Sequence, residues 1–227
     1  MIKEFYEKYP YPPLQYVPLV EVHKKPILEN LLVVGCGVTQ PYYEKSSNGF
    51  NSYTFVDISR TSLDIAKILV GNDSTCEFLE LDFNQPYQFD NKFSRISCCG
   101  VIHHNPEPNQ MIQNLSSNLQ QDGAVLVMVY RQCPDREVIK PAYEKFKELN
   151  YTVSDVMDYF NNNPNDLAKS WYDKHSKSKV EIADTWLNPY YKDYTEEELD
   201  TLMLSSGLKS VGYMPSLPTQ IGKIYVK

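Results

Sequence analysis

The feature that most constrains the fold is a regular alternation, from residue 31 onwards, between short apolar runs and segments with the 3.6-residue period of a helix. This alternation is typical of parallel strands joined by crossover helices, because helices then cover both faces of the sheet. We therefore expect an α/β fold built on a parallel sheet. The expected strands are residues 31–34, 53–56, 76–80, 94–98, 124–130, 208–213 and 223–226.

Helix boundary signals predict the main connections. Ser59 and Gly71 suit the first and last positions of a crossover helix. Met111 and Leu119 share one face of a second helix, which we expect to end near Gly123. Both helices join consecutive parallel strands, so the β-α-β rhythm continues through this half of the chain.

The rhythm stops after the fifth strand. Residues 133–194 are rich in Tyr, Asn and Lys and show one helical pattern, at 143–149. We interpret them as an insertion that binds a substrate, which is called the acceptor below. Thr195 and Glu198 predict a capping box at the start of a further helix, which Gly207 can close. The chain thus reads as a single domain with one insertion.

The first residues form a separate segment. The prolines between Tyr9 and Pro13 exclude a helix interior there, and we expect residues 1–26 to cover a surface or cleft. Tyr9 and Tyr11 are candidate acceptor-side residues that could lie over a cation, although plain packing explains them as well. Tyr130 and Arg131, at the end of the fifth strand, are further acceptor-side candidates.

Length and composition suit one domain. The 227 residues are 42% hydrophobic, which is enough for a large core. A net charge of −7 opposes attraction to phosphate, so nucleic acid is an unexpected partner. The five cysteines show no C-x-x-C spacing, the apolar runs are too short to span a bilayer, and the first residues do not resemble a signal peptide. We expect a cytoplasmic monomer or homodimer with no membrane partner.

The strongest local motif is an apolar strand that enters a G-x-G turn, Gly35-Cys36-Gly37. Asp57 ends the second strand twenty positions after Gly37, where a carboxylate can accept hydrogen bonds from both hydroxyls of a ribose. The third glycine of the dinucleotide pattern G-x-G-x-x-G is absent. A pyrophosphate needs that close helix approach, so the pattern favours S-adenosylmethionine over a nicotinamide cofactor.

Two further segments lie at the expected carboxyl edge of the sheet. Asp82 ends the third strand and can accept a hydrogen bond from the adenine amine, with Phe83 beside the ring; a turn-forming aspartate is the alternative. The fourth strand leads into Cys98-Cys99-Gly100-Val101-Ile102-His103-His104. Adjacent cysteines point to opposite faces of a strand, so we expect no metal site. His103 or His104 could act as a general base, line the pocket, or cap a helix.

The order of these segments resembles the motif series of class I S-adenosylmethionine-dependent methyltransferases. The resemblance lies in the runs V-G-C-G, V-D-I-S, L-D-F, C-G-V-I-H-H and L-Q-Q-D-G. Tyr6-Glu7, Pro10-Tyr11-Pro12 and residues 57–63 are also similar to a poorly characterised branch of that superfamily. The resemblance implies a Rossmann-like, doubly wound, seven-stranded sheet, mostly parallel, with helices on both faces and the last strand inserted antiparallel.

The resemblance also implies roles for individual residues. The residues implied at the cofactor are Gly35, Cys36 and Gly37 on the methionine side, Asp57 and Ile58 at the ribose, and Asp82 and Phe83 at the adenine. Cys99 is implied to lie beneath the cofactor. Many members carry an acid two residues before the first glycine, and this chain has Val33 there. The implied reaction is methyl transfer to a small-molecule acceptor. A nicotinamide-dependent oxidoreductase and a non-catalytic cofactor-binding protein that acts through a partner remain the alternatives.

Overall fold

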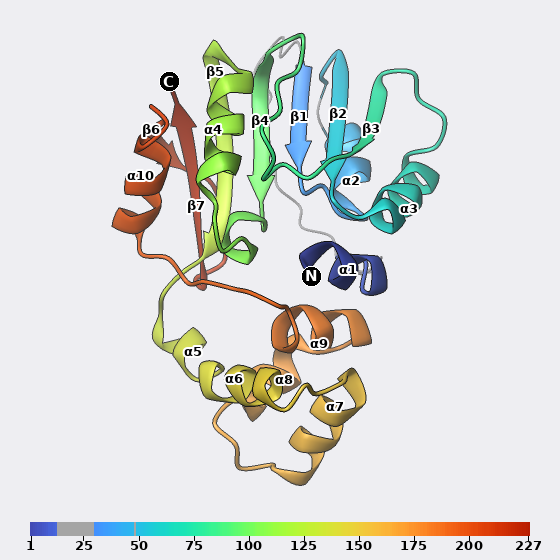
Figure 1. The fold of residues 1–227 in the computed structure, drawn as a ribbon, viewed down its shortest axis with the longest axis vertical. Coiled ribbons are helices and arrows are strands. Elements are labelled where there is room, and N and C mark those ends of the chain that lie inside the picture. The colour runs from blue at the N-terminus through green and yellow to red at the C-terminus, as the bar shows by residue number, and fades with distance from the viewer. Residues whose placement is uncertain (13–29, 48) are drawn as a thin grey trace.

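A seven-stranded sheet forms the centre of the computed structural model, which describes residues 1–12, 30–47 and 49–227 (Figure 1). The strands are β1 (Asn30–Val34), β2 (Ser52–Asp57), β3 (Cys76–Glu80), β4 (Phe93–Cys99), β5 (Leu119–Tyr130), β6 (Lys209–Tyr213) and β7 (Gln220–Val226). Their order is β3-β2-β1-β4-β5-β7-β6, and β7 runs antiparallel to β5 and β6 while the other pairs are parallel. The expected Rossmann-like α/β fold is confirmed.

Helices cover both faces of this sheet (Figure 1). On one face, α2 (Gln40–Ser47) and α3 (Arg60–Val70) contact each other. On the other face, α4 (Asn109–Asn118) and α10 (Glu196–Leu204) do the same. The doubly wound arrangement brings the carboxyl ends of β1 to β5 to one edge, where ligands bind in open α/β sheets.

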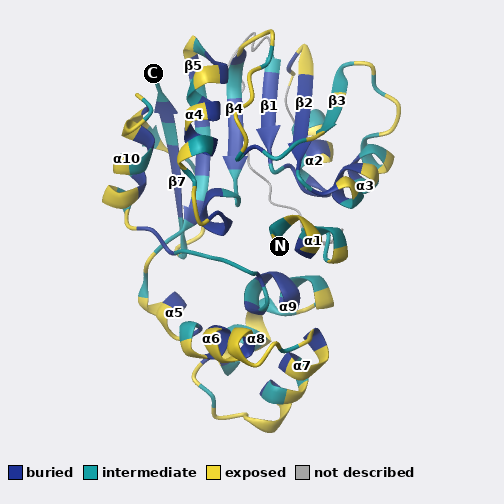
Figure 2. Ribbon diagram, in the orientation of Figure 1, coloured by how far each residue is buried: buried dark blue, intermediate teal, exposed yellow. Residues whose placement is uncertain are grey.

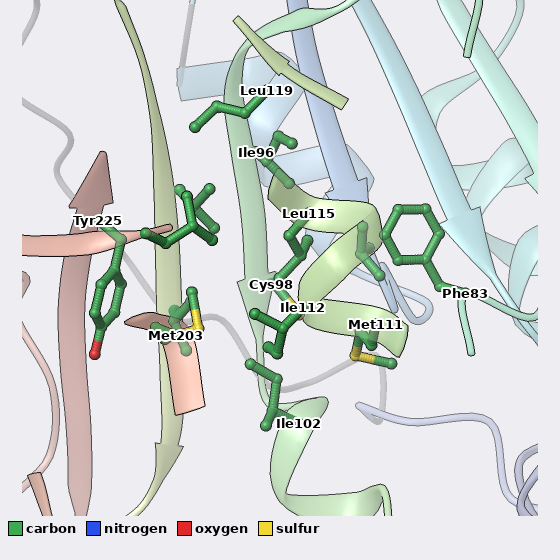
Figure 3. Packing of buried hydrophobic residues seen from close by; sticks show 14 of the residues in the cluster. Phe83, Ile96, Cys98, Ile102, Met111, Ile112, Leu115, Leu119, Met203 and Tyr225 are labelled. Atoms are coloured by element: carbon green, nitrogen blue, oxygen red, sulfur yellow. The ribbon is translucent and has the colours of Figure 1, made fainter. Parts of the chain in front are cut away.

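The central strand β1 is apolar at successive positions because both of its faces are buried. Leu32 and Val34 belong to a large apolar cluster with residues of α4 and α10, part of which Figure 3 shows. Leu31 and Val33 belong to a second cluster, which includes Leu63 of α3. A strand buried on both faces needs a continuous apolar run, and the sequence supplies one.

The predicted helix caps are present. Ser59 accepts a hydrogen bond from the Ser62 N–H at the start of α3, and Gly71 is the C-cap. Thr195 and Glu198 form both hydrogen bonds of a capping box at the start of α10. This helix ends at Leu204, and Gly207 follows with φ of 79°.

One predicted boundary is wrong. The helix that contains Met111 ends at Asn118, not near Gly123, and β5 begins at Leu119, five residues before the expected start at 124. Leu119 has an extended backbone with ψ of 139° and pairs with Phe93 of β4. Pairing with the neighbouring strand therefore overrides the helical spacing of the apolar residues.

Five helices between β5 and α10 form a second layer below the carboxyl edge of the sheet (Figure 1). They are α5 (Pro134–Glu137), α6 (Lys140–Glu148), α7 (Val153–Asn162), α8 (Lys169–His175) and α9 (Lys179–Trp186). The pattern predicted at 143–149 falls on α6. These helices bury an aromatic cluster that includes Phe146, Phe160 and Trp186, on the inward faces that Figure 2 shows dark blue.

The amino-terminal helix α1 (Ile2–Lys8) lies between the sheet edge and α9 (Figure 1). Its Phe5 side chain enters the aromatic cluster of the second layer. Glu7 on the opposite side accepts hydrogen bonds from the backbone N–H groups of Arg60 and Thr61, at 2.6 and 3.2 Å, and so caps α3. Helix α1 thus contacts both layers. Residues 13–26 of the predicted cover segment lie outside the described residues.

Two chain segments connect the layers and are held together by a buried ion pair. Arg131 forms a parallel β-bridge with Tyr194. Arg136 Nε lies 2.5 Å from Asp193 Oδ1, with both side chains at most 5% exposed. The guanidinium carbon of Arg136 also lies 3.6 Å from the ring centroid of Tyr130. In the described part of the chain, no helix has the length and apolar character needed to cross a bilayer.

Candidate active site

The G-x-G turn forms a tight elbow between β1 and α2. Gly35 and Gly37 have φ of 63° and 57°, in the left-handed region that favours glycine. A Cβ at Gly35 would lie 2.4 Å from a methyl group of Val101, and a Cβ at Gly37 would lie 2.3 Å from the carbonyl oxygen of Tyr11. Both glycines are therefore required by backbone conformation and by close approach.

Asp57 ties the end of β2 to this elbow. Its Oδ2 accepts the N–H of Gly37 at 2.8 Å, and its Oδ1 accepts the N–H of Ser59 at 2.9 Å. The side chain is buried, and burial raises the pKa of the carboxyl to about 6, although the backbone donors lower it. Each carboxylate oxygen keeps a lone pair for a further donor, such as a ribose hydroxyl.

Asp82 and Phe83 follow β3 at the same edge. Asp82 Oδ1 accepts a hydrogen bond from the N–H of Asn84 at 3.0 Å. This is the contact of a turn-forming aspartate, the alternative to adenine binding that the sequence left open. This bond and a ligand contact are compatible, because one carboxylate has several acceptor sites. Phe83 is buried, and its carbonyl accepts a hydrogen bond of 2.8 Å from Asn114 of α4.

The two cysteines at the end of β4 face opposite sides of the sheet. Cys98 belongs to the apolar cluster beneath α4 and α10, whereas Cys99 faces the other side. Burial raises the pKa of both thiols, in Cys99 to about 11. Among the described residues, no three His, Cys, Asp or Glu side chains are grouped so that they could hold a metal ion.

A cavity of about 690 Å³ lies at the carboxyl edge and brings these segments together. Each of the predicted cofactor residues lines it: Gly35, Cys36, Gly37, Asp57, Ile58, Asp82, Phe83 and Cys99. Its lining is mostly apolar with a few polar groups, and its size suits a ligand the size of a nucleoside derivative. The arrangement can hold an adenosyl group between the elbow and the ends of β2 and β3.

Residues 32–127 match the family model described as a methyltransferase domain. The matched segment runs from within β1 to within β5 and contains the elbow, Asp57 and Asp82. The antiparallel position of β7 is the one that the resemblance to class I methyltransferases implied.

Sequence relatives are distant. An uncharacterised protein of Synechococcus is 24% identical over 200 residues, which are 81% of this chain and 48% of the relative. A tRNA U34 carboxymethyltransferase of Sulfurimonas denitrificans is 26% identical over 131 residues, which are 56% of this chain and 40% of the relative. The chain thus spans about half the length of the curated relatives that it matches, or less.

Solved structures share the fold at low identity. PKMT2 from Rickettsia typhi matches with a TM-score of 0.68 and 14% identity over 95% of this chain and 54% of that one. Its complex with AdoHcy matches with a TM-score of 0.62 and 13% identity, over 89% of this chain and 50% of that one. At such identity the likeness extends to the fold alone.

The adjacent residues His103 and His104 differ in position. Both lie on the 3₁₀ helix η1 (Ile102–His104) and are buried, but only His104 lines the cavity. The His103 ring stacks on Tyr130 with 3.7 Å between centroids, and burial lowers its pKa well below the ordinary value. His103 is therefore placed in the packing beneath the site.

The acceptor-side candidates also differ in whether they line the cavity. Tyr11 lines the cavity, and its carbonyl accepts the N–H of Val38 at 3.2 Å. Tyr9, Tyr130 and Arg131 are not among the described residues that line it. Tyr9 packs against Phe5, and Arg131 forms an ion pair of 3.2 Å with Glu196.

Other cavity residues were missed. Thr39 precedes α2, Asn84 lies in the turn after β3, and Asn105 directly follows the 3₁₀ helix at 102–104. Tyr6 lies on a helix that the sequence did not predict, and donates its hydroxyl to Asp184 Oδ1 at 3.1 Å. Asn188, in the loop after α9, donates a hydrogen bond to the Tyr6 hydroxyl at 3.0 Å.

Proposed function

We propose that this chain transfers a methyl group from S-adenosylmethionine to a small-molecule acceptor. The observation that supports this most strongly is the hydrogen bond between the Gly37 N–H and Asp57, because it joins the elbow and the carboxylate at one cavity. In this proposal the elbow holds the methionine side, Asp57 and Ile58 hold the ribose, and Asp82 and Phe83 hold the adenine. Cys99 lies beneath the cofactor.

The residues present fit such a cofactor. Thr39 lines the cavity, and its buried hydroxyl oxygen has no hydrogen-bond partner among the described residues, so a polar ligand group can satisfy it. The glycines leave the elbow open to close approach. When bound, the cofactor supplies an activated methyl group on a sulfonium. The protein then mainly aligns the acceptor with that group and excludes water.

A nicotinamide cofactor fits less well at α2. The third glycine of the dinucleotide motif would stand at position 40, where this chain has Gln40 as the first residue of the helix. Its amide donates to the Ser97 hydroxyl at 3.1 Å, so a long side chain occupies the space where a pyrophosphate needs close backbone approach. The match to the methyltransferase domain model also favours S-adenosylmethionine over a nicotinamide cofactor.

A small acceptor suits the covered position of the cavity. Tyr11 and Pro12 lie directly against Gly37, and α1 with Tyr6 closes the side towards α9. We infer that residues 133–194 and the described part of the 1–26 segment select the acceptor. The lining contains no lysine or arginine among the described residues, which gives nucleic acid no electrostatic support.

Calorimetry and label transfer together test the proposal. We expect S-adenosylmethionine and S-adenosylhomocysteine to bind in the micromolar range or tighter, and NAD⁺ and NADH to give no heat of binding. The protein is then incubated with cell extract and methyl-labelled cofactor, and labelled small molecules are separated by mass. Binding without any labelled product would favour the non-catalytic alternative, and preferential NAD binding would refute the cofactor assignment.

A further inference from the structure

The side chain of His104 is held by one specific hydrogen bond. Its Nδ1 lies 3.0 Å from the backbone carbonyl oxygen of Tyr190, in the segment that leads from α9 back to the sheet. A carbonyl oxygen can only accept, so Nδ1 must carry the proton. In the neutral ring, Nε2 then has a free lone pair. Within the described residues, no hydrogen bond reaches Nε2.

The surroundings keep this ring neutral. Burial lowers the pKa of His104, and Arg136 on α5 lowers it further, while Asp184 on α9 and the Tyr190 carbonyl act in the opposite direction. His103 lies next to it with 4.3 Å between ring centroids, and Tyr130 and Tyr6 contact it edge-on from β5 and α1. His104 is thus an unprotonated imidazole at neutral pH, with one ring nitrogen fixed and the other available.

Asp184 can stabilise the ring once it gains a proton. It is buried, and its Oδ1 accepts the hydroxyl hydrogen of Tyr6, which in turn accepts from Asn188. A carboxylate that interacts electrostatically with His104 favours the imidazolium form. Asp184 acts here as a positioning and charge-stabilising residue, since it is not among the residues that line the cavity.

We propose that Nε2 of His104 is the general base of the methyl transfer and that the acceptor is a small, uncharged hydroxy compound, an alcohol or phenol. This inference rests on the proposed function. It assigns the catalytic role to His104 and not to His103, and it identifies the chemical group that is methylated.

The choice of a hydroxyl follows from what a neutral base can do. An uncharged amine already offers a lone pair and can attack before it loses a proton, whereas a hydroxyl group must lose its proton as it is methylated. A carboxylate acceptor would need no base and would require a cation for binding. The described lining holds no lysine or arginine and includes the acids Glu44, Asp57 and Asp82, so it opposes an anionic acceptor.

The proposed step balances. The acceptor oxygen forms a bond to the methyl carbon, and the bond between that carbon and the sulfonium sulfur breaks, with its electron pair remaining on sulfur. The hydroxyl proton moves to Nε2 of His104, which becomes imidazolium. The products are a methyl ether and S-adenosylhomocysteine, and the imidazolium returns its proton to solvent.

The first test needs no acceptor. Protein with ¹⁵N-labelled histidine is saturated with S-adenosylhomocysteine, and the ring nitrogens are followed by NMR as pH changes, with His104→Gln used for assignment. We expect His104 to be protonated on Nδ1 and unprotonated on Nε2 at pH 7, and to titrate below 6.5. A proton on Nε2 at pH 7, or a ring still charged at pH 7, would overturn the proposal.

The second test determines to which kind of atom the labelled methyl group is bound in the product. We expect a label that survives alkali and that does not appear on a basic nitrogen, as for an ether. An alkali-labile ester or a methylamine would overturn this inference alone. No labelled product at all, with the cofactor bound, would overturn the proposed function and this inference with it.

Substitutions then separate a base from a packing residue. With the identified acceptor, His104→Gln and His104→Asn should lower kcat by about 10²- to 10⁴-fold, the usual contribution of a general base. Cofactor affinity should change less than about threefold, and the control Asp64→Ala, on the exposed surface of α3, should leave kcat unchanged. Asp184→Asn should move the acidic limb of the rate profile to lower pH. Full activity in both His104 variants would refute the assignment.

Discussion

Replacement of Asp57 by alanine should weaken cofactor binding by an amount that the structure allows us to work out. The carboxylate is buried and is held by two backbone donors, from Gly37 at 2.8 Å and from Ser59 at 2.9 Å. Its remaining lone pairs can accept the two ribose hydroxyls. A hydrogen bond to a charged group contributes about 1.5 to 3 kcal/mol, and part of the loss is recovered by water in the enlarged site. We expect Asp57→Ala to cost about 1.5 to 3 kcal/mol of binding free energy.

That cost corresponds to a 10- to 150-fold increase in Kd, on the scale of about 1.4 kcal/mol per tenfold change. Titration calorimetry with S-adenosylhomocysteine measures it, with circular dichroism to show that the variant is folded. Asp64→Ala, on the exposed surface of α3, is the matched control and should bind as the unmodified protein does. Equal affinities in folded Asp57→Ala and in the control would refute the placement of the ribose at Asp57.

Three further predictions concern stability. Gly37→Ala should have a Tm at least about 3 °C below that of Gly71→Ala in thermal scans, because both residues have positive φ but only a Cβ at Gly37 meets the Tyr11 carbonyl; equal values would contradict this. The pKa of Asp57 is raised from 3.8 to about 6, so this group contributes stability below pH 4 that is lost as pH rises through 6. In urea unfolding, the free energy of unfolding of the unmodified protein relative to that of Asp57→Asn should fall by about 2 to 3 kcal/mol between pH 4 and 7.5. A relative free energy that does not change with pH would refute this prediction. Arg136→Met should cost about 3 to 5 kcal/mol in the same assay, because Asp193 loses its close buried cation and keeps the partly exposed Lys140, 3.8 Å away; a cost below about 1 kcal/mol would count against the importance of the buried pair.

The sheet could be predicted because its signals are local. A strand such as β1 must be apolar throughout, since it is buried on both faces, and its register follows from neighbours of the same kind. The helix caps at Ser59 and Thr195 depend only on residues close to them in the sequence. By contrast, the start of β5 at Leu119 depends on pairing with β4, so a helical spacing of apolar residues gave the wrong boundary there.

The cofactor side of the site was predictable for the same reason. Gly35, Gly37 and Asp57 each stand at the end of a strand, and parallel strands bring their ends to one edge. The acceptor side was not. His103 and His104 are chemically identical neighbours, and their different positions involve contacts with residues distant in the sequence, such as Tyr130 for His103 and Tyr190 for His104. Tyr6 was missed because its helix gains its stability from contacts with α3 and α9.

The most direct test of the central claim is an experimental structure of the protein with S-adenosylhomocysteine bound. We predict that the ribose hydroxyls lie within hydrogen-bond distance of Asp57, with the adenine beside Asp82 and Phe83 and the amino-acid end at the elbow of residues 35–37. An adenosyl group bound elsewhere, or one whose ribose makes no contact with Asp57, would contradict the account.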